Sequence, residues 1–377
     1  MTLSNCRILI TGANGFIGKN LVVHLNELAN ITISTFVRGD DTARLPQLVA
    51  QADAVVHLAG ENRPADEAAF SQVNAGLTSA LCGAIQQEYT TTGRHVPLVL
   101  ASSTQVERDN PYGRSKLAAE AAVKSLAQAT GNPCVAFRLP GVFGKWCKPS
   151  YNSVVATFCH NLARDLPIQI NDPDASVRLV YVDDVVNALL NVLKVPSSGY
   201  TQPAVEPVYT ITLGELAAQI RAFADCRSTL MSERVGTGLV RALYATYVSY
   251  LPNEKFSYEV QQHADPRGVF VEMLKTPDSG QFSYFTAHPG ITRGGHYHHT
   301  KTEKFLVIKG EALFRFRHLL TDELVELRAS GTTPQVVDTI PGWSHDITNV
   351  GDDEMVVMLW ANENFDRQKP DTVASKV

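Results

Sequence analysis

A short apolar strand, a glycine-rich turn and a helical pattern open the chain in that order. Residues 7–11 (RILIT) read as the strand, and helical spacing begins at Lys19. Between them, Gly12, Gly15 and Gly18 lie three residues apart. Such a turn brings backbone N–H groups and a helix N-terminus close to a pyrophosphate. A packing turn without a ligand is the alternative, but the strand–turn–helix order favours a dinucleotide site.

Beyond this turn the sequence continues to alternate between apolar, β-rich runs and helical stretches. The strand-like runs cover residues 32–37, 54–58, 97–101 and 134–139, and the helical stretches cover residues 66–89, 112–130 and 213–223. Strands that alternate with helices predict a parallel sheet covered by helices on both faces. We therefore expect an α/β, doubly wound domain of Rossmann type.

The texture of the sequence changes around residues 245–265. Further on, short strand-like pieces recur without helical periodicity, at residues 268–274, 281–287, 303–308, 312–318, 336–340 and 353–360. Short strands at near-regular spacing predict an all-β barrel or sandwich. We place the boundary near residue 250, which gives domains 1–250 and 251–377.

Charge and histidine content also differ between the two parts of this 377-residue chain. Residues 1–250 carry 20 basic and 20 acidic side chains, whereas residues 251–377 carry 13 and 18 and supply the whole net charge of −5. Seven of the eleven histidines lie in the second part. Because no basic excess exists, partners such as nucleic acid or an anionic membrane surface are excluded.

The remaining composition indicates a cytoplasmic protein. No run of 18 apolar residues exists, so we expect no membrane-spanning helix. The N-terminus lacks a basic head followed by a long apolar stretch, so no signal peptide is expected. Six cysteines without a C-x-x-C pair do not form a disulfide framework in a chain of this length. Buried thiols are expected, and a reactive cysteine is the minor alternative.

Three polar residues predict proton transfer to or from a carbonyl oxygen. Tyr112 and Lys116 are four residues apart at an expected helix start and share a face, and Ser103 follows the fourth strand. A free tyrosine has a pKa near ~10, which a lysine ammonium would lower. The serine hydroxyl can hydrogen-bond a substrate oxygen while a nicotinamide moves a hydride. The Y-x-x-x-K spacing alone is common by chance. Its occurrence after a glycine fingerprint and a serine at a strand end is very unlikely to be accidental.

Arg38 follows the second strand, where a nicotinamide site that prefers NAD usually has an acidic residue. Its guanidinium could pair bidentately with a ribose 2′-phosphate, which favours NADP(H). A solvated surface arginine is the alternative, and Asp40 and Asp41 lie close by in sequence.

The first part of the chain resembles the extended branch of the short-chain dehydrogenase/reductase superfamily, which acts on nucleotide sugars. The motifs TGANGFIG, VVHLAG, LASST, YGRSK and RLPGVFG match it in order. The resemblance implies Tyr112 as acid/base, Lys116 as its partner and a ribose contact, and Ser103 as the carbonyl hydrogen bond. It implies cofactor binding by Gly12, Asn14, Gly15, Phe16, Ile17, Gly18, Arg38, Leu58, Ala59, Gly60 and Lys116.

The same resemblance implies two substrate-binding residues, Arg178 and Asn152. Arg178 falls where this branch often places a diphosphate-binding arginine. An ordinary salt bridge between Arg178 and an aspartate of the same domain is an equally favoured interpretation. Eight residues separate Ser103 from Tyr112, a shorter loop than most extended members have. Thr104 and Gln105 stand where sugar dehydratases carry an acidic pair. Carbonyl reduction, or the reverse oxidation, is therefore favoured over dehydration.

A histidine cluster dominates the second part. His296 and His298 would point the same way on a strand, Glu303 follows on the next strand, and His345 lies downstream. Three imidazoles and a carboxylate suit a divalent transition metal. The spacing matches both motifs of the cupin superfamily, G-x5-H-x-H-x4-E-x6-G and P-G-x2-H-x3-N. Zinc fits these ligands best, and iron, manganese and nickel are the alternatives. The metal could have either a structural or a catalytic role.

The neighbours of these ligands include three candidate proton carriers, Tyr297, His299 and Lys301, which the sequence does not rank.

The order of the two halves resembles the bifunctional CapF or WbjC type of UDP-N-acetyl-L-fucosamine synthesis. The stretches GHYHHTKTEKFLVIKG and DNPYGRSKL carry this resemblance. It implies a UDP-linked 4-keto-6-deoxy-N-acetylhexosamine substrate, inversion of C3 by the cupin half, and then reduction of the C4 ketone with NADPH. The product would be UDP-2-acetamido-2,6-dideoxy-L-talose. A homodimer is expected by analogy.

Two other functions are weighed beside this one. The first is an NADP-dependent nucleotide-sugar dehydrogenase or 4-epimerase with a structural or passive cupin. The second is a sugar-sensing protein whose first half is a degenerate scaffold. The intact set of Ser103, Tyr112 and Lys116 argues against the sensor.

Overall fold

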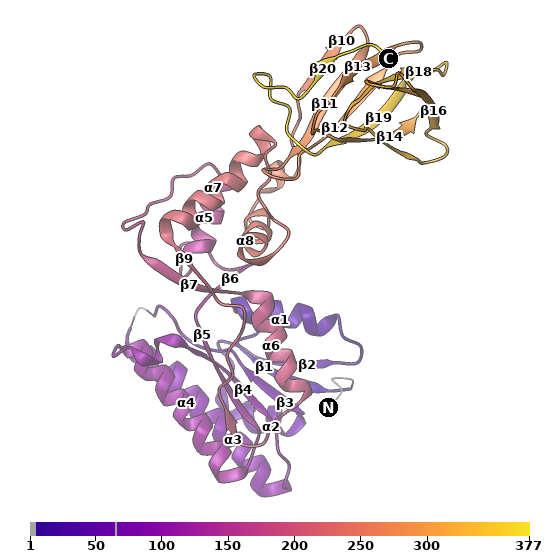
Figure 1. Cartoon of the computed structure of the whole chain (residues 1–377). Helices are drawn as coiled ribbons and strands as arrows, with labels where there is room; N and C mark the ends of the chain where they lie inside the picture. Colours follow the sequence, from indigo (N-terminus) through magenta and orange to yellow (C-terminus); the bar gives the residue numbers. More distant parts are fainter. Residues whose placement is uncertain (1–4, 65) are drawn as a thin grey trace. The chain divides into compact units, whose positions relative to one another are not determined.

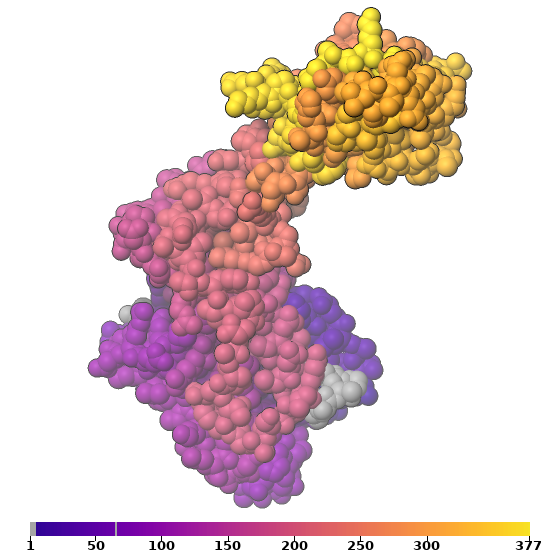
Figure 2. Space-filling view, in the orientation of Figure 1, coloured from indigo at the N-terminus to yellow at the C-terminus, as the bar shows by residue number. Residues whose placement is uncertain are grey.

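The computed structural model describes residues 5–64 and 66–377 and divides into two compact units (Figure 1). The first unit contains the chain up to Ile220 together with Ala242–Leu251, and the second contains Arg221–Arg241 and Pro252–Val377. Figure 2 shows the surface of both units, with the C-terminal residues of the second coloured orange to yellow. The border at residue 250 between functional domains stays a prediction, because Arg221–Arg241 groups with the second unit.

A parallel six-stranded sheet with the order β2-β1-β3-β4-β5-β8 organises the first unit. The strands are β1 (Arg7–Thr11), β2 (Thr32–Phe36), β3 (Ala54–His57), β4 (Leu98–Ser103), β5 (Cys134–Leu139) and β8 (Tyr200–Thr201). The alternation of apolar residues along β1 serves both faces, because Ile8 and Ile10 pack in one core cluster and Leu9 packs in the other. The expected α/β doubly wound sheet is confirmed.

Helices cover both faces of this sheet, as Figure 1 shows. Side chains of α1 (Phe16–Asn26) and α6 (Val182–Lys194) belong to the core cluster on the Ile8 face. Those of α2 (Leu45–Gln51), α3 (Leu77–Thr92) and α4 (Pro111–Thr130) belong to the cluster on the Leu9 face. The resulting three layers leave the carboxyl ends of the strands free for a ligand.

Two local signals set the ends of α4, the helix that carries Tyr112. Asn110 precedes it, and its side chain accepts a hydrogen bond of 2.8 Å from the N–H of Gly113. Pro111 occupies the first turn, where its missing N–H costs nothing. Gly131 ends the helix in the left-handed conformation, with φ of 73°.

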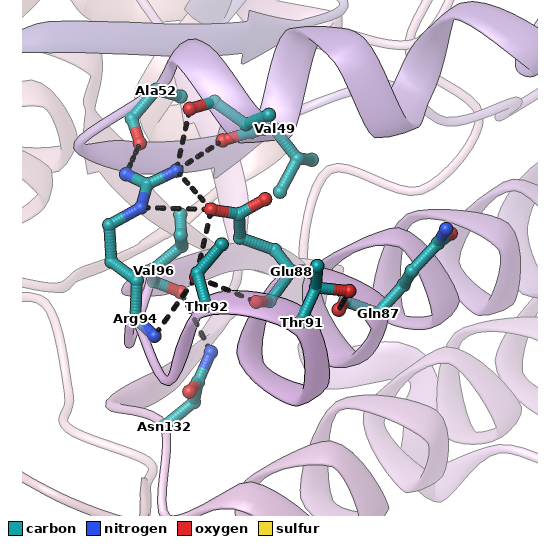
Figure 3. A network of polar contacts seen from close by, with 10 residues as sticks. Val49, Ala52, Gln87, Glu88, Thr91, Thr92, Arg94, Val96 and Asn132 are labelled. Atoms are coloured by element: carbon teal, nitrogen blue, oxygen red, sulfur yellow. Dashed lines mark hydrogen bonds and ion pairs between the residues drawn. The ribbon is translucent and has the colours of Figure 1, made fainter.

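Arg94 ties α2 to α3 at the edge of this layer (Figure 3). Its guanidinium donates to the carbonyls of Ala52 at 2.6 Å, Ala50 at 2.7 Å and Val49 at 3.1 Å. These carbonyls lie at the C-terminal end of α2, where helical partners run out. The carboxylate of Glu88 on α3 balances the charge at 3.0 Å. The pair therefore fixes the packing of two helices.

A smaller group of elements completes the first two-thirds of the chain. It contains the three-stranded sheet β6-β7-β9 and the helices α5, α7 and α8. Their bounds are β6 (Gly141–Phe143), β7 (Ser176–Tyr181), β9 (Tyr209–Thr212), α5 (Val154–Leu162), α7 (Leu213–Thr229) and α8 (Gly238–Val248). A π-helical turn, Phe70–Gly76, precedes α3, and short 3-10 turns cover Thr42–Arg44, Thr104–Glu107 and Asn253–Lys255. Within the described residues, no helix has the length and apolar character needed to cross a membrane.

Two antiparallel sheets form the second unit, with the orders β10-β11-β12-β19-β14-β17 and β16-β15-β18-β13-β20. The strands are β10 (Gln262–Asp265), β11 (Gly268–Lys275), β12 (Gln281–Ala287), β13 (Thr292–Tyr297), β14 (Glu303–Lys309), β15 (Glu311–His318), β16 (Leu324–Ser330), β17 (Val336–Asp338), β18 (Trp343–Asn349), β19 (Met355–Ala361) and β20 (Val373–Ala374). Phe285, Phe305 and Phe314 join the two sheets in one aromatic core. The expected all-β second part is confirmed.

Candidate active site and metal centre

The glycine turn between β1 and α1 is packed so closely that side chains do not fit. A Cβ on Gly12, where φ is +73°, would lie 2.6 Å from the backbone nitrogen of Ala59. A Cβ on Gly18 would lie 2.3 Å from the carbonyl oxygen of Gly12. Gly15 precedes Phe16 at the start of α1 without a side-chain cap, so the first N–H groups of the helix stay available to an anion.

A cavity of about 550 Å³ opens over this turn, at the carboxyl ends of the parallel strands. This volume lies within the range of about 300–1,000 Å³ that is usual for small-molecule sites. The structure brings the following predicted residues to its walls: Gly12, Asn14, Gly15, Phe16, Ile17, Gly18, Arg38, Leu58, Gly60, Ser103, Tyr112, Lys116 and Asn152. Ala59 and Arg178 are not among the described wall residues, and Arg178 is exposed on β7.

The predicted catalytic residues meet at one end of this cavity. Ser103 ends β4 and hydrogen-bonds Tyr112, which lies on the first turn of α4. Lys116 is only 7% exposed, and its ammonium donates to the carbonyl of Ala101 at 3.0 Å. Burial lowers the pKa of Lys116 to about 8, against the opposing effect of the Glu120 carboxylate.

The pKa of Tyr112 departs from the expectation. A lysine neighbour was expected to lower it, but burial raises the pKa of Tyr112, and the hydrogen bond with Ser103 offsets only part of that rise. Desolvation of the phenolate dominates because the ring is largely buried and packs edge-on against Phe70, with centroids 5.7 Å apart. In this state Tyr112 therefore holds its proton, as a proton donor must.

A buried asparagine, Asn74, links the segment after β3 to the helix that carries Lys116. It was not identified from the sequence. Asn74 accepts a 2.8 Å hydrogen bond from the N–H of Glu61, and its amide donates at 2.9 Å to the hydroxyl of Ser115. A Cβ added to Gly60 would lie 3.1 Å from both the Asn74 oxygen and the Lys116 nitrogen. The segment after β3 is therefore held against α4. No sequence signal marked Asn74, which lies in the π-helical turn.

Arg38 does not stand free at the cavity wall. Its guanidinium forms an ion pair with Glu61, although the Arg38 side chain is 86% exposed. The second carboxylate oxygen of Glu61 accepts a hydrogen bond of 3.2 Å from the hydroxyl of Tyr151. All three residues line the cavity, so Arg38 must share its charge between Glu61 and any phosphate that enters.

In the second unit the four predicted metal ligands converge. One ligand atom from each of His296, His298, Glu303 and His345 lies within 4.8 Å of all the others. The Nε2 atom of His298 lies 3.2 Å, and that of His345 3.5 Å, from the same oxygen of Glu303. Both ring nitrogens of His345 are buried without a hydrogen-bond partner among the described residues. A divalent metal with N/O ligands fits this set, because it would satisfy the unpaired imidazole.

The surroundings of the cluster prepare its donor atoms. The Nδ1 atom of His298 hydrogen-bonds the carbonyl of Asp371, which leaves its Nε2 lone pair facing the cluster. Burial lowers the pKa of His296 to about 4, so its imidazole is neutral near pH 7. Burial alone would raise the pKa of Glu303, but the adjacent imidazoles of His298 and His345 and the Lys301 ammonium outweigh it and hold the pKa below its usual value.

One of the three predicted proton carriers contacts this cluster. The ammonium of Lys301 lies 2.8 Å from Glu303 Oε1 and is buried. Tyr297 and His299 instead pack against each other, with ring centroids 5.5 Å apart, and His299 is exposed.

Both halves of the chain match known families. The NAD dependent epimerase/dehydratase family matches residues 8–206, and the polysaccharide biosynthesis C-terminal domain matches residues 263–373. A Pseudomonas aeruginosa protein named UDP-2-acetamido-2,6-beta-L-arabino-hexul-4-ose reductase is 55% identical, over 98% of this chain and 99% of its own. The capsular polysaccharide assembling protein CapF from Staphylococcus aureus is 40% identical over 98% of this chain and 100% of its own, with a TM-score of 0.88. The chain belongs to the CapF family.

A further CapF structure, with the inhibitor 3-isopropenyl-tropolone, is 36% identical over 98% of this chain and 100% of its own, with a TM-score of 0.84. Membership of the CapF family confirms the resemblance that the motifs indicated. The family description also supports a nicotinamide cofactor in the first unit.

Proposed function

We propose that this CapF-family chain is a bifunctional enzyme of UDP-N-acetyl-L-fucosamine (capsule or O-antigen) synthesis that acts on a UDP-linked 4-keto-6-deoxy-N-acetylhexosamine. The second unit inverts C3, and the first unit then reduces the C4 ketone with NADPH to give UDP-2-acetamido-2,6-dideoxy-L-talose. The observation that carries the reductase half is the hydrogen-bonded pair of Ser103 and Tyr112, with Lys116 on the same helix, at the end of the glycine-turn cavity. The name of the Pseudomonas aeruginosa relative supports the same substrate class.

The reduction uses three side chains in defined roles. A nicotinamide bound over the glycine turn would supply the hydride for C4. Ser103 donates a hydrogen bond to the C4 oxygen, and Tyr112 gives that oxygen its proton, so the ketone becomes an alcohol. The positive charge of the Lys116 ammonium stabilises the tyrosinate left behind. Burial lowers the pKa of Lys116 to about 8, so the lysine is still mostly protonated near pH 7.

The preference for NADPH is proposed from Arg38. A guanidinium binds a ribose 2′-phosphate bidentately. Glu61, the present partner of Arg38, opposes this binding, so the phosphate must draw Arg38 away from the carboxylate or share it. Asn152 lines the cavity and is proposed as a substrate contact, whereas the exposed position of Arg178 outside the described wall gives that role no support.

The order of the two reactions follows from carbonyl chemistry. The C3 proton is acidic only while C4 is a ketone, because the electron pair of the broken C–H bond delocalises into an enolate. The proton passes to a basic group that exchanges with solvent, and return from the opposite face inverts C3. Epimerisation must therefore precede reduction.

The metal is proposed to be zinc, held by His296, His298, Glu303 and His345. When bound there, it would supply a positive charge that polarises a ketone or a neighbouring hydroxyl. A purely structural metal is the alternative, and C3 exchange that continues after removal of the metal would indicate it.

The test is NMR of the products formed from the UDP-4-keto sugar and NADPH in deuterated water. We expect deuterium at C3, hydride-derived protium at C4 and one NADPH oxidised per sugar. A C4 ketone that persists without net NADPH oxidation, although C3 exchanges, would contradict the reductase. Absence of deuterium at C3 with the fully metal-loaded protein would contradict the epimerase. Cytoplasmic location and a homodimer stay predictions.

A further inference from the structure

A second, smaller cavity lies inside the antiparallel unit, beside the histidine cluster. Its volume is about 150 Å³, below the range of about 300–1,000 Å³ of sites for whole drug-sized ligands, so it takes one ring or group rather than a complete nucleotide sugar. Phenylalanine rings make up much of its wall. Its polar wall residues include Arg293, His296, Glu303, His345 and Asp346.

A β-bulge aims Arg293 into this cavity. In β13, Arg293 pairs with Ile347 and His296 pairs with His345, and the register shifts between them. The extra residue places Arg293 and His296 on the same face although they are three apart. Gly295, with φ of +75°, is the extra residue of the bulge. Its neighbour Gly294 has φ of +98°, and a Cβ there would lie 2.9 Å from the carbonyl oxygen of His345. Both side chains consequently line the same cavity.

The guanidinium of Arg293 is held in place but not neutralised. Its Nε atom donates to the carbonyl of Thr286 at 3.0 Å, and its carbon lies 5.2 Å from the ring centroid of Phe285. Its Nη2 atom is buried and has no hydrogen-bond partner in the described part of the chain. A buried donor without a partner is costly, which points to a ligand that completes it.

The carboxylates around Arg293 are already paired with other cations. These pairs are Glu303 with Lys301 at 2.8 Å, Asp346 with Arg315 at 2.6 Å and Asp265 with Arg267 at 2.5 Å. Among the described residues, Arg293 is the only lysine or arginine in the wall of this cavity, and no ion pair joins it to a carboxylate. Its charge is available to an incoming anion in a site of low dielectric.

We infer that Arg293 binds the oxyanion formed in the cupin cavity, the C4 oxygen of the sugar as deprotonation of C3 turns the ketone into an enolate. This inference rests on the proposed epimerase. Donors fixed where negative charge develops stabilise a transition state without reorganising. The Arg293 guanidinium interacts more strongly with the negatively charged enolate oxygen than with the neutral ketone oxygen. Its main effect is therefore on the rate of C3 exchange.

The test compares Arg293→Gln and Arg293→Lys with a matched control, Arg317→Gln. Arg317 belongs to β15 of the same unit, but it pairs with Asp322 at the surface. The first measurement is deuterium incorporation at C3 of the UDP-4-keto sugar without NADPH, by full-length protein of equal metal content and equal Tm. We expect a loss of about 10²–10³-fold in Arg293→Gln, partial recovery in Arg293→Lys and no loss in the control.

The second measurement needs no epimerase activity. Calorimetry with acetate, a small oxyanion, on the same metal-loaded proteins should show binding that weakens at least about tenfold in Arg293→Gln. If wild-type protein shows no C3 exchange but its acetate binding depends on Arg293, the anion site stands and the epimerase fails. Acetate binding and C3 exchange at wild-type levels in Arg293→Gln would overturn the inference. Equal losses in Arg317→Gln would overturn it as well.

Discussion

Individual side chains of the reductase site are tuned mainly by burial. Desolvation raises the pKa of Tyr112 and lowers that of Lys116, because in each case the charged form loses water. Tyr112 thus keeps the proton that a reduction needs. Lys116 stays protonated near pH 7 partly because the Glu120 carboxylate, one turn further along α4, raises its pKa.

The role of Tyr112 predicts a separation of the two activities. Tyr112→Phe removes the proton donor and should lower NADPH consumption by about 10²–10⁴-fold. Deuterium exchange at C3 should continue, because the second unit carries its own site. The measurements are absorbance of NADPH and NMR of the sugar, with equal NADPH binding as the control for folding. Loss of both activities in a folded variant would show that the domains are not chemically separable.

The lowered pKa of Lys116 predicts the pH dependence of reduction. Below about pH 8 the lysine is protonated and supports the tyrosinate; as pH rises through about 8 it loses its charge. We therefore expect kcat/KM for the C4 reduction to fall tenfold per pH unit above that point. The pH profile of steady-state NADPH oxidation checks this.

Glu120 provides the matching variant. Its carboxylate raises the pKa of Lys116, so Glu120→Gln should move the alkaline limb to lower pH. Glu107→Gln is the control, since Glu107 is largely exposed and lies 4.0 Å from Arg138, which also binds Glu120. An unmoved limb in Glu120→Gln would assign the limb to another group.

At the scale of elements, the β1–α1 turn and the β13 bulge position the two sites. Each depends on a glycine that closely approaches the backbone of another segment, Gly12 near Ala59 after β3 and Gly294 near His345 on β18. A side chain at either position would clash with backbone atoms, which cannot move aside as a flexible side chain could. The glycines are required by tertiary approach as well as by positive φ.

A pair of glycine variants separates these two reasons. Gly12 and Gly39 both have positive φ, but a Cβ on Gly39 meets nothing within 4 Å. Gly39→Ala should cost about 1–2 kcal/mol of stability from φ alone. Gly12→Ala should cost more and also weaken NADPH binding, because the turn must move. Urea unfolding and NADPH titration measure both, and equal effects of the two variants would contradict close packing at Gly12.

At the scale of the whole molecule, the two units have separate hydrophobic cores. Clusters on the two faces of the parallel sheet stabilise the first, and an aromatic cluster between two antiparallel sheets stabilises the second. The proposed metal ligands belong entirely to the second unit. Metal loss should consequently act on one unit.

Removal of the metal by a chelator should lower the Tm of the second unit and leave that of the first unchanged. Buried imidazoles and a carboxylate would lose the cation that satisfies them. A catalytic metal predicts that C3 exchange stops and returns with zinc, while reduction of a sugar already inverted by untreated enzyme continues. Calorimetry and NMR follow these effects. Continued C3 exchange without metal would make the metal structural.

Elements with strong local patterns were predictable, and those defined by pairing were not. The expected strands at residues 7–11, 54–58 and 134–139 match β1, β3 and β5 within one residue. By contrast, β16 and β18 lie outside the expected strand runs, and β13 was expected only as a strand around His296 and His298. Glycines interrupt the alternation of β13, and the outward face of β16 is largely exposed, so neither carries a clear apolar period.

The sequence by itself determined the motifs: the glycine turn, Tyr112 with Lys116, and the spacing of the histidines. These signals are local, because a turn, a helix face or a strand face needs only neighbouring residues. Tertiary structure alone decided that Arg38 pairs with Glu61 and that Arg293 turns into the second cavity beside His296. Partners far apart in the chain meet through sheet register and burial, which no local pattern encodes.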